Sequence, residues 1–349
     1  MSSGTHAGRW RVIAWNLIVL AAIFGLGEAV GALLLANPGK APAPFLRGMR
    51  HYYFSHDRNI IQMREGCGQY DPGLGYTLRP GQCEFKNREF ATTVRVNSLG
   101  TRDDEASLSG PEIVVVGDSY AMGWGVDQGE TFADLLQRDT GRRVLNLAVS
   151  SYGTAREMTM LSRADRSRLA AIVIQYCEND YYENTTFRDH GNSLPIMNEA
   201  TYLAAVASQA KASRYFPGKY TLRLLPAVAR YPVRNLFFKD AEDEIDAGDE
   251  AAAFLNVLAW HGLPAPGGAP VIVLELNEPQ KSDNRFAEAL EAMALEIGME
   301  GLTVLRLAGM LGPEDYFVLD SHIRPSGHGK VAAELVKTLA GLGVAGGTR

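Results

Sequence analysis

From residue 111 onward the chain alternates short apolar runs with amphipathic stretches, and this alternation limits the fold more than any other feature. Runs of Val, Ile and Leu bounded by turn residues predict buried strands, and the amphipathic stretches predict helices. The expected strands are 112–118, 142–150, 169–180, 269–277 and 302–309, and the expected helices are 130–139, 154–164, 284–298 and 326–342. Strands that alternate with helices predict a mostly parallel sheet covered on both faces, so we expect an α/β fold.

The composition of the chain fits a globular protein with a full hydrophobic core. Of its 349 residues, 46% are hydrophobic and 21% are charged. The formal net charge of -6 gives no support for nucleic-acid binding. The three cysteines show neither a CxxC motif nor the Cys/His spacing of a zinc site, so we expect no structural metal.

Residues 12–36 form an apolar run in which Glu28 is the only charged residue. The run is long enough to cross a hydrocarbon core about 30 Å thick, and it exceeds the apolar core of a signal peptide. No small-residue cleavage motif follows it, so we predict an uncleaved transmembrane signal anchor after a cytoplasmic tail, residues 1–11. Basic residues flank the run on both sides and do not orient it. Glu28 is expected either to contact a partner inside the membrane or to lie near the outer interface.

The segment 37–110 is rich in Pro, Gly and aromatic residues and contains short stretches of alternating polarity. This composition predicts a small β-rich or irregular lead-in rather than an independent domain. Cys67 and Cys83 bracket a short loop within it. A disulfide between them is plausible if the domain lies outside the cytosol, although closeness in sequence does not establish bonding distance.

An insertion at about 184–269 separates the third expected strand from the fourth. Its part from Arg214 to Lys239 contains basic and aromatic residues and no acidic residue, and the next segment, 240–250, is strongly acidic. Such a basic, aromatic stretch could lie on anionic lipid headgroups or bind a polyanionic substrate. The alternative is that the basic and acidic segments pair with each other on the surface.

Polar side chains that can support nucleophilic chemistry follow several of the expected strands. Ser119 comes directly after the first strand, Asn179 follows the third, and Asp320 and His322 follow the fifth. The carboxyl ends of parallel strands meet at one edge of a sheet, where ligands bind in open α/β folds. A nucleophilic serine needs a base, a group that orients the base, and donors for an oxyanion. The sequence offers a candidate for each role.

Four segments resemble the conserved blocks of the SGNH/GDSL hydrolase family, in the order of that family. Gly117–Ser119 resembles the nucleophile block, Asn146–Thr154 the glycine block, Asn179–Asp180 the asparagine block, and Asp320 with His322 the terminal acid–histidine block. The resemblance spans residues 111–345. It implies a three-layer α/β/α fold of the flavodoxin-like kind, acyl-ester chemistry, and no cofactor.

The resemblance also assigns catalytic roles. Ser119 would attack an ester carbonyl, His322 would take the proton from its hydroxyl, and Asp320 would hold the imidazole. One residue separates Asp320 from His322, whereas the family commonly has two. We nevertheless favour His322 over His328 as the base, because His328 falls in the Gly-His that often opens the last helix of such proteins.

For the oxyanion the resemblance implies the backbone N–H of Ser119, an N–H of the second block, and the Asn179 side chain. The usual glycine of the second block is Ser151 here, with Gly153 two residues later, so either N–H is a candidate. Cys177 replaces the glycine that normally precedes the asparagine by two residues, and we interpret it as a buried, unpaired thiol.

The anchored arrangement resembles family members that add or remove O-acyl groups, most often acetyl, on envelope glycans. We therefore predict a single-pass protein of a bacterial inner membrane whose domain faces the periplasm and acts as an esterase or O-acyltransferase. Expected partners are an envelope polysaccharide or other acylated substrate and, for transfer, a polytopic membrane acyltransferase. Two alternatives remain open: a lipid or phospholipid esterase, and a non-catalytic glycan-binding or assembly subunit.

Overall fold

The computed structural model describes residues 4–230, 245–279, 281 and 283–344, which fall into two compact units. The first unit, the anchor unit, comprises the described parts of Met1–Arg58, Lys211–Glu242 and Val318–Asp320. The second, the sheet unit, comprises the described parts of Asn59–Ala210, Asp243–Phe317 and Ser321–Arg349.

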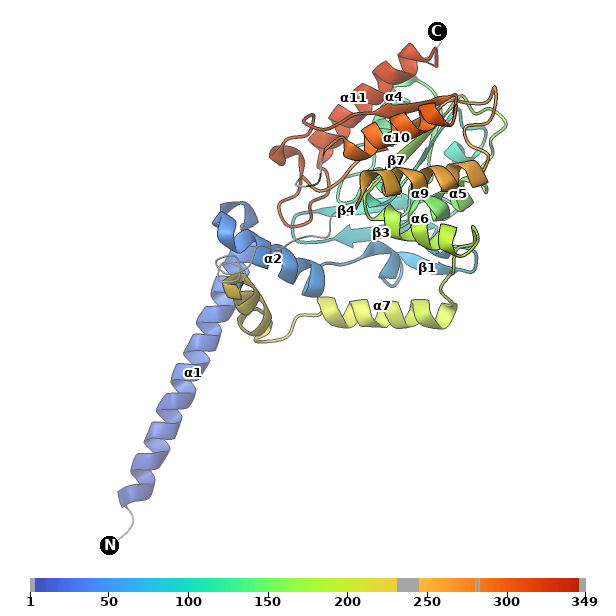
Figure 1. Cartoon of the computed structure of the whole chain (residues 1–349). Coiled ribbons are helices and arrows are strands. Elements are labelled where there is room, and N and C mark those ends of the chain that lie inside the picture. The colour runs from blue at the N-terminus through green and yellow to red at the C-terminus, as the bar shows by residue number, and fades with distance from the viewer. Residues whose placement is uncertain (1–3, 231–244, 280, 282, 345–349) are drawn as a thin grey trace. The chain divides into compact units, whose positions relative to one another are not determined.

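The sheet unit is built on five parallel strands (Figure 1). They are β5 (Ile113–Val116), β6 (Val144–Asn146), β7 (Ala171–Tyr176), β8 (Val271–Glu275) and β9 (Leu302–Leu305). Their order in the sheet is β6-β5-β7-β8-β9, the 2-1-3-4-5 order of flavodoxin-like sheets. The predicted α/β fold and its five strands are therefore confirmed. β5 pairs with both β6 and β7, so the segment after β5 lies where the strand order reverses, the usual ligand site of such folds.

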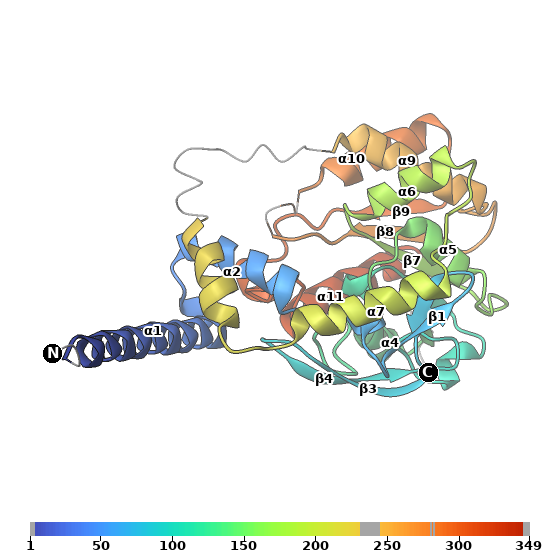
Figure 2. The same ribbon diagram turned by 90° about the horizontal axis from the view of Figure 1, so that it is seen from below.

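Helices cover both faces of this sheet, and successive residues of β5 show the division. Ile113 and Val115 belong to the core formed with α4 and α11, whereas Val114 and Val116 belong to the core formed with α5, α9 and α10. Figure 2 shows α9 and α10 on the opposite side of β7 and β8 from α11. The helices of this unit are α3 (Ser119–Met122), α4 (Phe132–Thr140), α5 (Thr154–Leu161), α6 (Asp180–Asp189), α9 (Ala247–Trp260), α10 (Arg285–Glu296) and α11 (Pro325–Gly341).

The lead-in contributes two antiparallel hairpins to the sheet unit, as its alternating stretches indicated. The hairpins are β1 (Gly68–Asp71) with β2 (Gly75–Leu78), and β3 (Gly81–Lys86) with β4 (Ala91–Val96). A disulfide joins Cys67 to Cys83, with their Cα atoms 5.3 Å apart, and thereby ties the start of the first hairpin to a strand of the second. Cys83 and Phe85 are buried in the same core as β5.

The region 184–269 is divided between the two units and is not an insertion throughout. Residues 247–260 form α9, which packs against the sheet as the helix that precedes β8. Helix α7 (Glu199–Ser213) begins in the sheet unit, and its last residues, from Lys211, belong to the anchor unit. Residues 231–244, which include Arg234, Lys239 and the start of the acidic segment, lie outside the described residues. The pairing of basic with acidic segments therefore stays a prediction.

The anchor unit contains a long N-terminal helix, α1 (Gly4–Ala36), together with α2 (Ala43–His56) and a π-helical turn, η4 (Tyr220–Leu224). Within α1 the segment Arg9–Ala36 is long and apolar enough to cross a membrane, and an 18-residue window in it has a mean hydropathy of 2.3. Helix α2 differs from the β-rich or irregular structure expected for residues 37–110. Tyr52, Tyr53 and Leu224 of α2 and η4 form a small apolar core with Leu35 of α1.

The disulfide leads to a prediction about stability. Replacing Cys67 and Cys83 by serine should lower the melting temperature, because the bond restricts the unfolded chain between residues separated by 16 positions, which is worth about 3 kcal/mol. Circular dichroism of the full chain in detergent, with and without reductant, measures this. Reductant should destabilise the wild type and a Cys177→Ala control alike, but leave the double variant unchanged. A double variant as stable as the oxidised wild type would contradict the prediction.

Candidate active site

The segment after β5 places Ser119 at the first position of α3 in a turn that its neighbours fix. A Cβ on Gly117 would lie 2.7 Å from both the Ala121 Cβ and the Gln175 Oε1 atom, so this position has room only for glycine. Gln175 Oε1 accepts the N–H groups of Asp118 and Ala121 at 3.2 and 3.0 Å. The Asp118 carboxylate caps the helix by accepting the N–H of Tyr120 at 2.9 Å. Asp118 thus shapes the turn, and burial raises the pKa of its carboxyl group.

The Ser119 hydroxyl oxygen lies 2.7 Å from Nε2 of His322, a hydrogen-bonding distance across 203 positions of sequence. Both side chains are buried, at 8% and 6% exposure. The imidazole is stacked on the indole of Trp124, with centroids 5.0 Å apart, and lies 4.8 Å from the ring of Tyr120. An imidazole in contact with a serine hydroxyl can serve as a general base toward it, so the geometry fits an activated nucleophile.

The loop before α11 presents His322 through backbone hydrogen bonds. The N–H of Phe317 donates to the carbonyl of His322 at 2.9 Å, and the N–H of Ser321 donates to the carbonyl of Phe317 at 3.2 Å. Ser321 has a φ of +62°, a left-handed conformation that few residues other than glycine adopt. The hydroxyl of Tyr120 donates to the carbonyl of Ser321 at 3.2 Å and so ties this loop to α3.

Asp320 belongs to the anchor unit, where two other side chains bind its carboxylate. The hydroxyl of Tyr53 donates to Oδ2, and Nη2 of Arg58 lies 3.4 Å from Oδ1. The Asp320 side chain is 1% exposed, and such partners offset the cost of burying a carboxylate. Neither partner was predicted from the sequence. Its role as the acid that orients His322 stays a proposal.

His328, the competing histidine, has a structural role. Its ring is fully buried, and Nδ1 accepts the N–H of Phe132 at the start of α4 at 3.1 Å. Burial lowers the pKa of His328 to about 3, so the imidazole is neutral at physiological pH. This agrees with the choice of His322 over His328 as the base.

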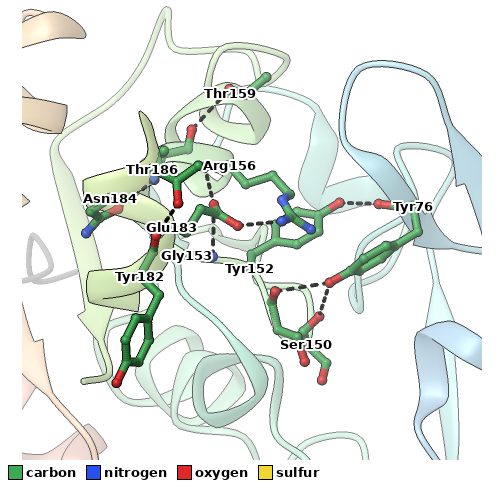
Figure 3. Close-up of polar contacts among 12 residues, drawn as sticks. Tyr76, Ser150, Tyr152, Gly153, Arg156, Thr159, Tyr182, Glu183, Asn184 and Thr186 are labelled. Atoms are coloured by element: carbon green, nitrogen blue, oxygen red, sulfur yellow. Dashed lines mark hydrogen bonds and ion pairs between the residues drawn. The ribbon is translucent and has the colours of Figure 1, made fainter. Parts of the chain in front are cut away.

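Hydrogen bonds and an ion pair hold the loop after β6 in place (Figure 3). They also determine which backbone N–H groups of the loop can bind a ligand. The carboxylate of Glu183 accepts the N–H of Gly153 at 3.1 Å and that of Arg156 at 3.0 Å, and it also pairs with the Arg156 guanidinium. The same guanidinium lies over the rings of Tyr76 and Tyr152, 5.3 and 5.0 Å from their centroids. Because its N–H is bound to Glu183, we withdraw Gly153 as an oxyanion donor.

Ser151 is the remaining candidate in this loop. Its φ is +63°, a left-handed conformation that glycine adopts more readily than serine. Its hydroxyl accepts a hydrogen bond from Nε2 of Gln62 at 3.1 Å, and its carbonyl accepts one from the Tyr76 hydroxyl at 3.0 Å. Within the described residues its N–H donates to no acceptor, so the group is available to a ligand.

Two further predicted residues follow β7. Asn179 is exposed, and its side-chain amide does not cap α6. Cys177 is a free, buried cysteine as expected, and its thiol lies 3.1 Å from Oδ1 of Asn277. Burial raises the pKa of the Cys177 thiol, so it is a poor nucleophile. Among the described residues no three His, Cys, Asp or Glu side chains are grouped in a way that could hold a metal ion.

No protein-family model matches the chain, and a search of curated proteins finds no match. Solved structures similar to it include a GDSL-like lipase from Bacteroides ovatus, at 14% identity and a TM-score of 0.38, over 66% of this chain and 53% of that protein. A salicylyl-acyltransferase from a tetracycline biosynthetic pathway matches at 14% identity and 0.37, over 70% and 57%. An acetyl xylan esterase from Butyrivibrio proteoclasticus matches at 15% identity and 0.35, over 66% and 64%. The chain thus spans less than two thirds of each of these proteins.

The conformation of Ser151 leads to a prediction about substitutions. Alanine and glycine both lose the hydrogen bond from Gln62, but alanine keeps the cost of a positive φ, whereas glycine adopts the same φ without strain. Ser151→Ala should therefore melt below Ser151→Gly by a few degrees, corresponding to about 1 kcal/mol. Thermal unfolding of the two variants and the wild type in one detergent tests this. An alanine variant as stable as the glycine variant would show that Ser151 is not strained.

Proposed function

We propose that the chain is an SGNH-type serine esterase or O-acyltransferase. The observation that carries the proposal is the 2.7 Å contact between the Ser119 hydroxyl and Nε2 of His322, at the edge of the sheet where ligands bind in this fold. The order of the strands, with the sites of Ser119, Ser151 and Asn179 after β5, β6 and β7, supports it.

In the proposed reaction His322 Nε2 accepts the hydroxyl proton as Ser119 Oγ forms a bond to the ester carbonyl carbon. The negative charge that develops on the carbonyl oxygen would be stabilised by the N–H groups of Ser119 and Ser151 and by the Asn179 amide. His322 then gives the proton to the departing alcohol, which leaves an acyl group on Ser119. Asp320 is assigned the role of holding the imidazole in the required tautomer.

The acyl group leaves when an acceptor hydroxyl attacks its carbonyl carbon and gives its proton to His322. The bond from this carbon to Ser119 Oγ then breaks, and His322 returns the proton to Oγ. Water as the acceptor makes the protein an esterase, and a sugar hydroxyl makes it an O-acyltransferase. We propose an acylated envelope polysaccharide as the substrate, with acetyl as the acyl group, and a polytopic membrane acyltransferase as a donor in the case of transfer. A lipid or phospholipid esterase is the alternative, and release of acetate from a polysaccharide or of fatty acid from a phospholipid distinguishes the two.

We propose further that α1 anchors the chain in a bacterial inner membrane, with the sheet unit in the periplasm. The length and apolarity of Arg9–Ala36 support the anchor. The disulfide between Cys67 and Cys83 supports the orientation, because such bonds persist in the periplasm and are rare in the cytosol.

The catalytic proposal predicts the behaviour of two variants. Ser119→Ala and His322→Ala should each lower the hydrolysis of p-nitrophenyl acetate by roughly 1,000-fold or more, because the nucleophile and its base act as a unit. The full chain in detergent micelles is the sample. Matched controls are Ser167→Ala and His190→Ala, which replace exposed residues of the same types and should keep the wild-type rate. Equal rates in all five proteins would contradict Ser119 as the nucleophile.

A further inference from the structure

The segment Tyr215–Leu224, which we call the juxtamembrane segment, packs directly against α1. A Cβ on Gly27 would lie 2.5 Å from the Thr221 Oγ1 atom, and one on Gly31 would lie 2.5 Å from the Tyr220 Cβ atom. Glycines four positions apart share one face of a helix and allow another backbone to approach it closely. In this helix that face is occupied by the juxtamembrane segment.

The same contact supplies hydrogen-bond donors to Glu28, the only charged residue of the apolar run 12–36. The carboxylate of Glu28 accepts the N–H of Thr221 at 2.8 Å, its hydroxyl at 3.0 Å, and the hydroxyl of Tyr215 at 2.8 Å. A carboxylate in hydrocarbon is costly unless such donors bind it. The anchor unit therefore supplies donors to Glu28 from its own chain.

The position of Glu28 along α1 indicates how deep in the membrane its contacts with Tyr215 and Thr221 lie. An α-helix rises 1.5 Å per residue, so about 20 residues counted from Val12 cover a hydrocarbon core of about 30 Å and end near Gly31. Glu28 lies within that length, one turn from its far end. Residues bound to Glu28 must then lie at the same depth, in the leaflet far from the N-terminus.

The side chains of the juxtamembrane segment suit that environment. Leu222 is 58% exposed, and Phe216 is also exposed. Gly218 lies beside the ring of Phe24, a residue of the apolar run. Lys219, by contrast, is buried; its ammonium donates to the carbonyls at positions 212 and 213 and lies 3.8 Å from the carboxylate of Asp57.

We propose that the juxtamembrane segment enters the outer leaflet beside α1, with Leu222 and Phe216 in contact with lipid acyl chains. The proposal rests on the proposed membrane anchor, and it gives part of the basic, aromatic stretch a defined place. The Arg223 side chain is compatible with a place in the outer leaflet. Its guanidinium lies 5.5 Å from the centroid of the Phe216 ring and 3.1 Å from Nδ1 of His56. A long cationic side chain can keep its stem in an apolar layer while its head reaches the interface.

Fluorescence quenching by spin-labelled lipids tests the proposal on the full chain in phosphatidylcholine–phosphatidylglycerol vesicles. Leu222→Cys carries the test label, Leu26→Cys marks the exposed face of α1, and Tyr182→Cys marks an exposed site of the sheet unit. The native cysteines give little background, because Cys67 is bonded to Cys83 and Cys177 is buried. A nitroxide on the acyl chain should quench the Leu222 label to within about twofold of the Leu26 label and leave the Tyr182 label unquenched.

The outcomes separate this proposal from the anchor itself. A quenched Leu26 label beside an unquenched Leu222 label would overturn the proposal and leave the anchor standing; a blue-shifted but unquenched Leu222 label would show that protein covers the segment instead of lipid. An unquenched Leu26 label would contradict the anchor, and with it this proposal.

Discussion

Parallel pairing of β5 with both β6 and β7 is the constraint on which the candidate site depends. This pairing brings the carboxyl ends of the three strands to one edge of the sheet. The residues that follow the strands are therefore close in space, although they are far apart in the sequence. The turn after β5 is held by Gln175, a residue of β7, so the pairing that places Ser119 at the edge also fixes its orientation. Buried hydrogen bonds of this kind make such a turn rigid.

The sheet could be predicted from local sequence patterns, and the pairing of Ser119 with His322 from the resemblance of their segments to the SGNH/GDSL blocks. Runs of β-branched residues mark the strands, and the serine and histidine stand directly after strands or in recognisable motifs. Helix α2 was missed because it lies in a Pro- and Gly-rich region, although Met49, Tyr52 and Tyr53 stand at helical spacing.

The residues that surround the catalytic pair could not be predicted in the same way. Trp124 stacks on His322, and Tyr53 and Arg58 bind Asp320, but these contacts join positions about 200 or more apart. Gly153 failed as an oxyanion candidate for a similar reason, since Glu183, which takes its N–H, lies 30 positions away in α6. Only the folded chain shows such partners.

In the anchor unit, residues far from Glu28 in the sequence pack around its carboxylate and donate hydrogen bonds to it. Glu28 in an apolar run left two interpretations open from the sequence, a partner contact or an interfacial position. The structure gives it donors from Tyr215 and Thr221 of the same chain, next to a close approach at Gly27 and Gly31. The hydrogen bonds to Glu28 and the close packing at Gly27 and Gly31 therefore occur on the same part of α1.

The central claim, that Ser119 is a nucleophile activated by His322, is tested most directly by covalent labelling. A fluorophosphonate reacts with a serine whose hydroxyl is activated by a base, and peptide mass spectrometry locates the adduct. We expect one adduct, on Ser119, in the wild-type chain and no adduct in His322→Ala. An unmodified Ser119, or equal labelling of Ser119 in the His322→Ala variant, would contradict its role as a nucleophile activated by His322.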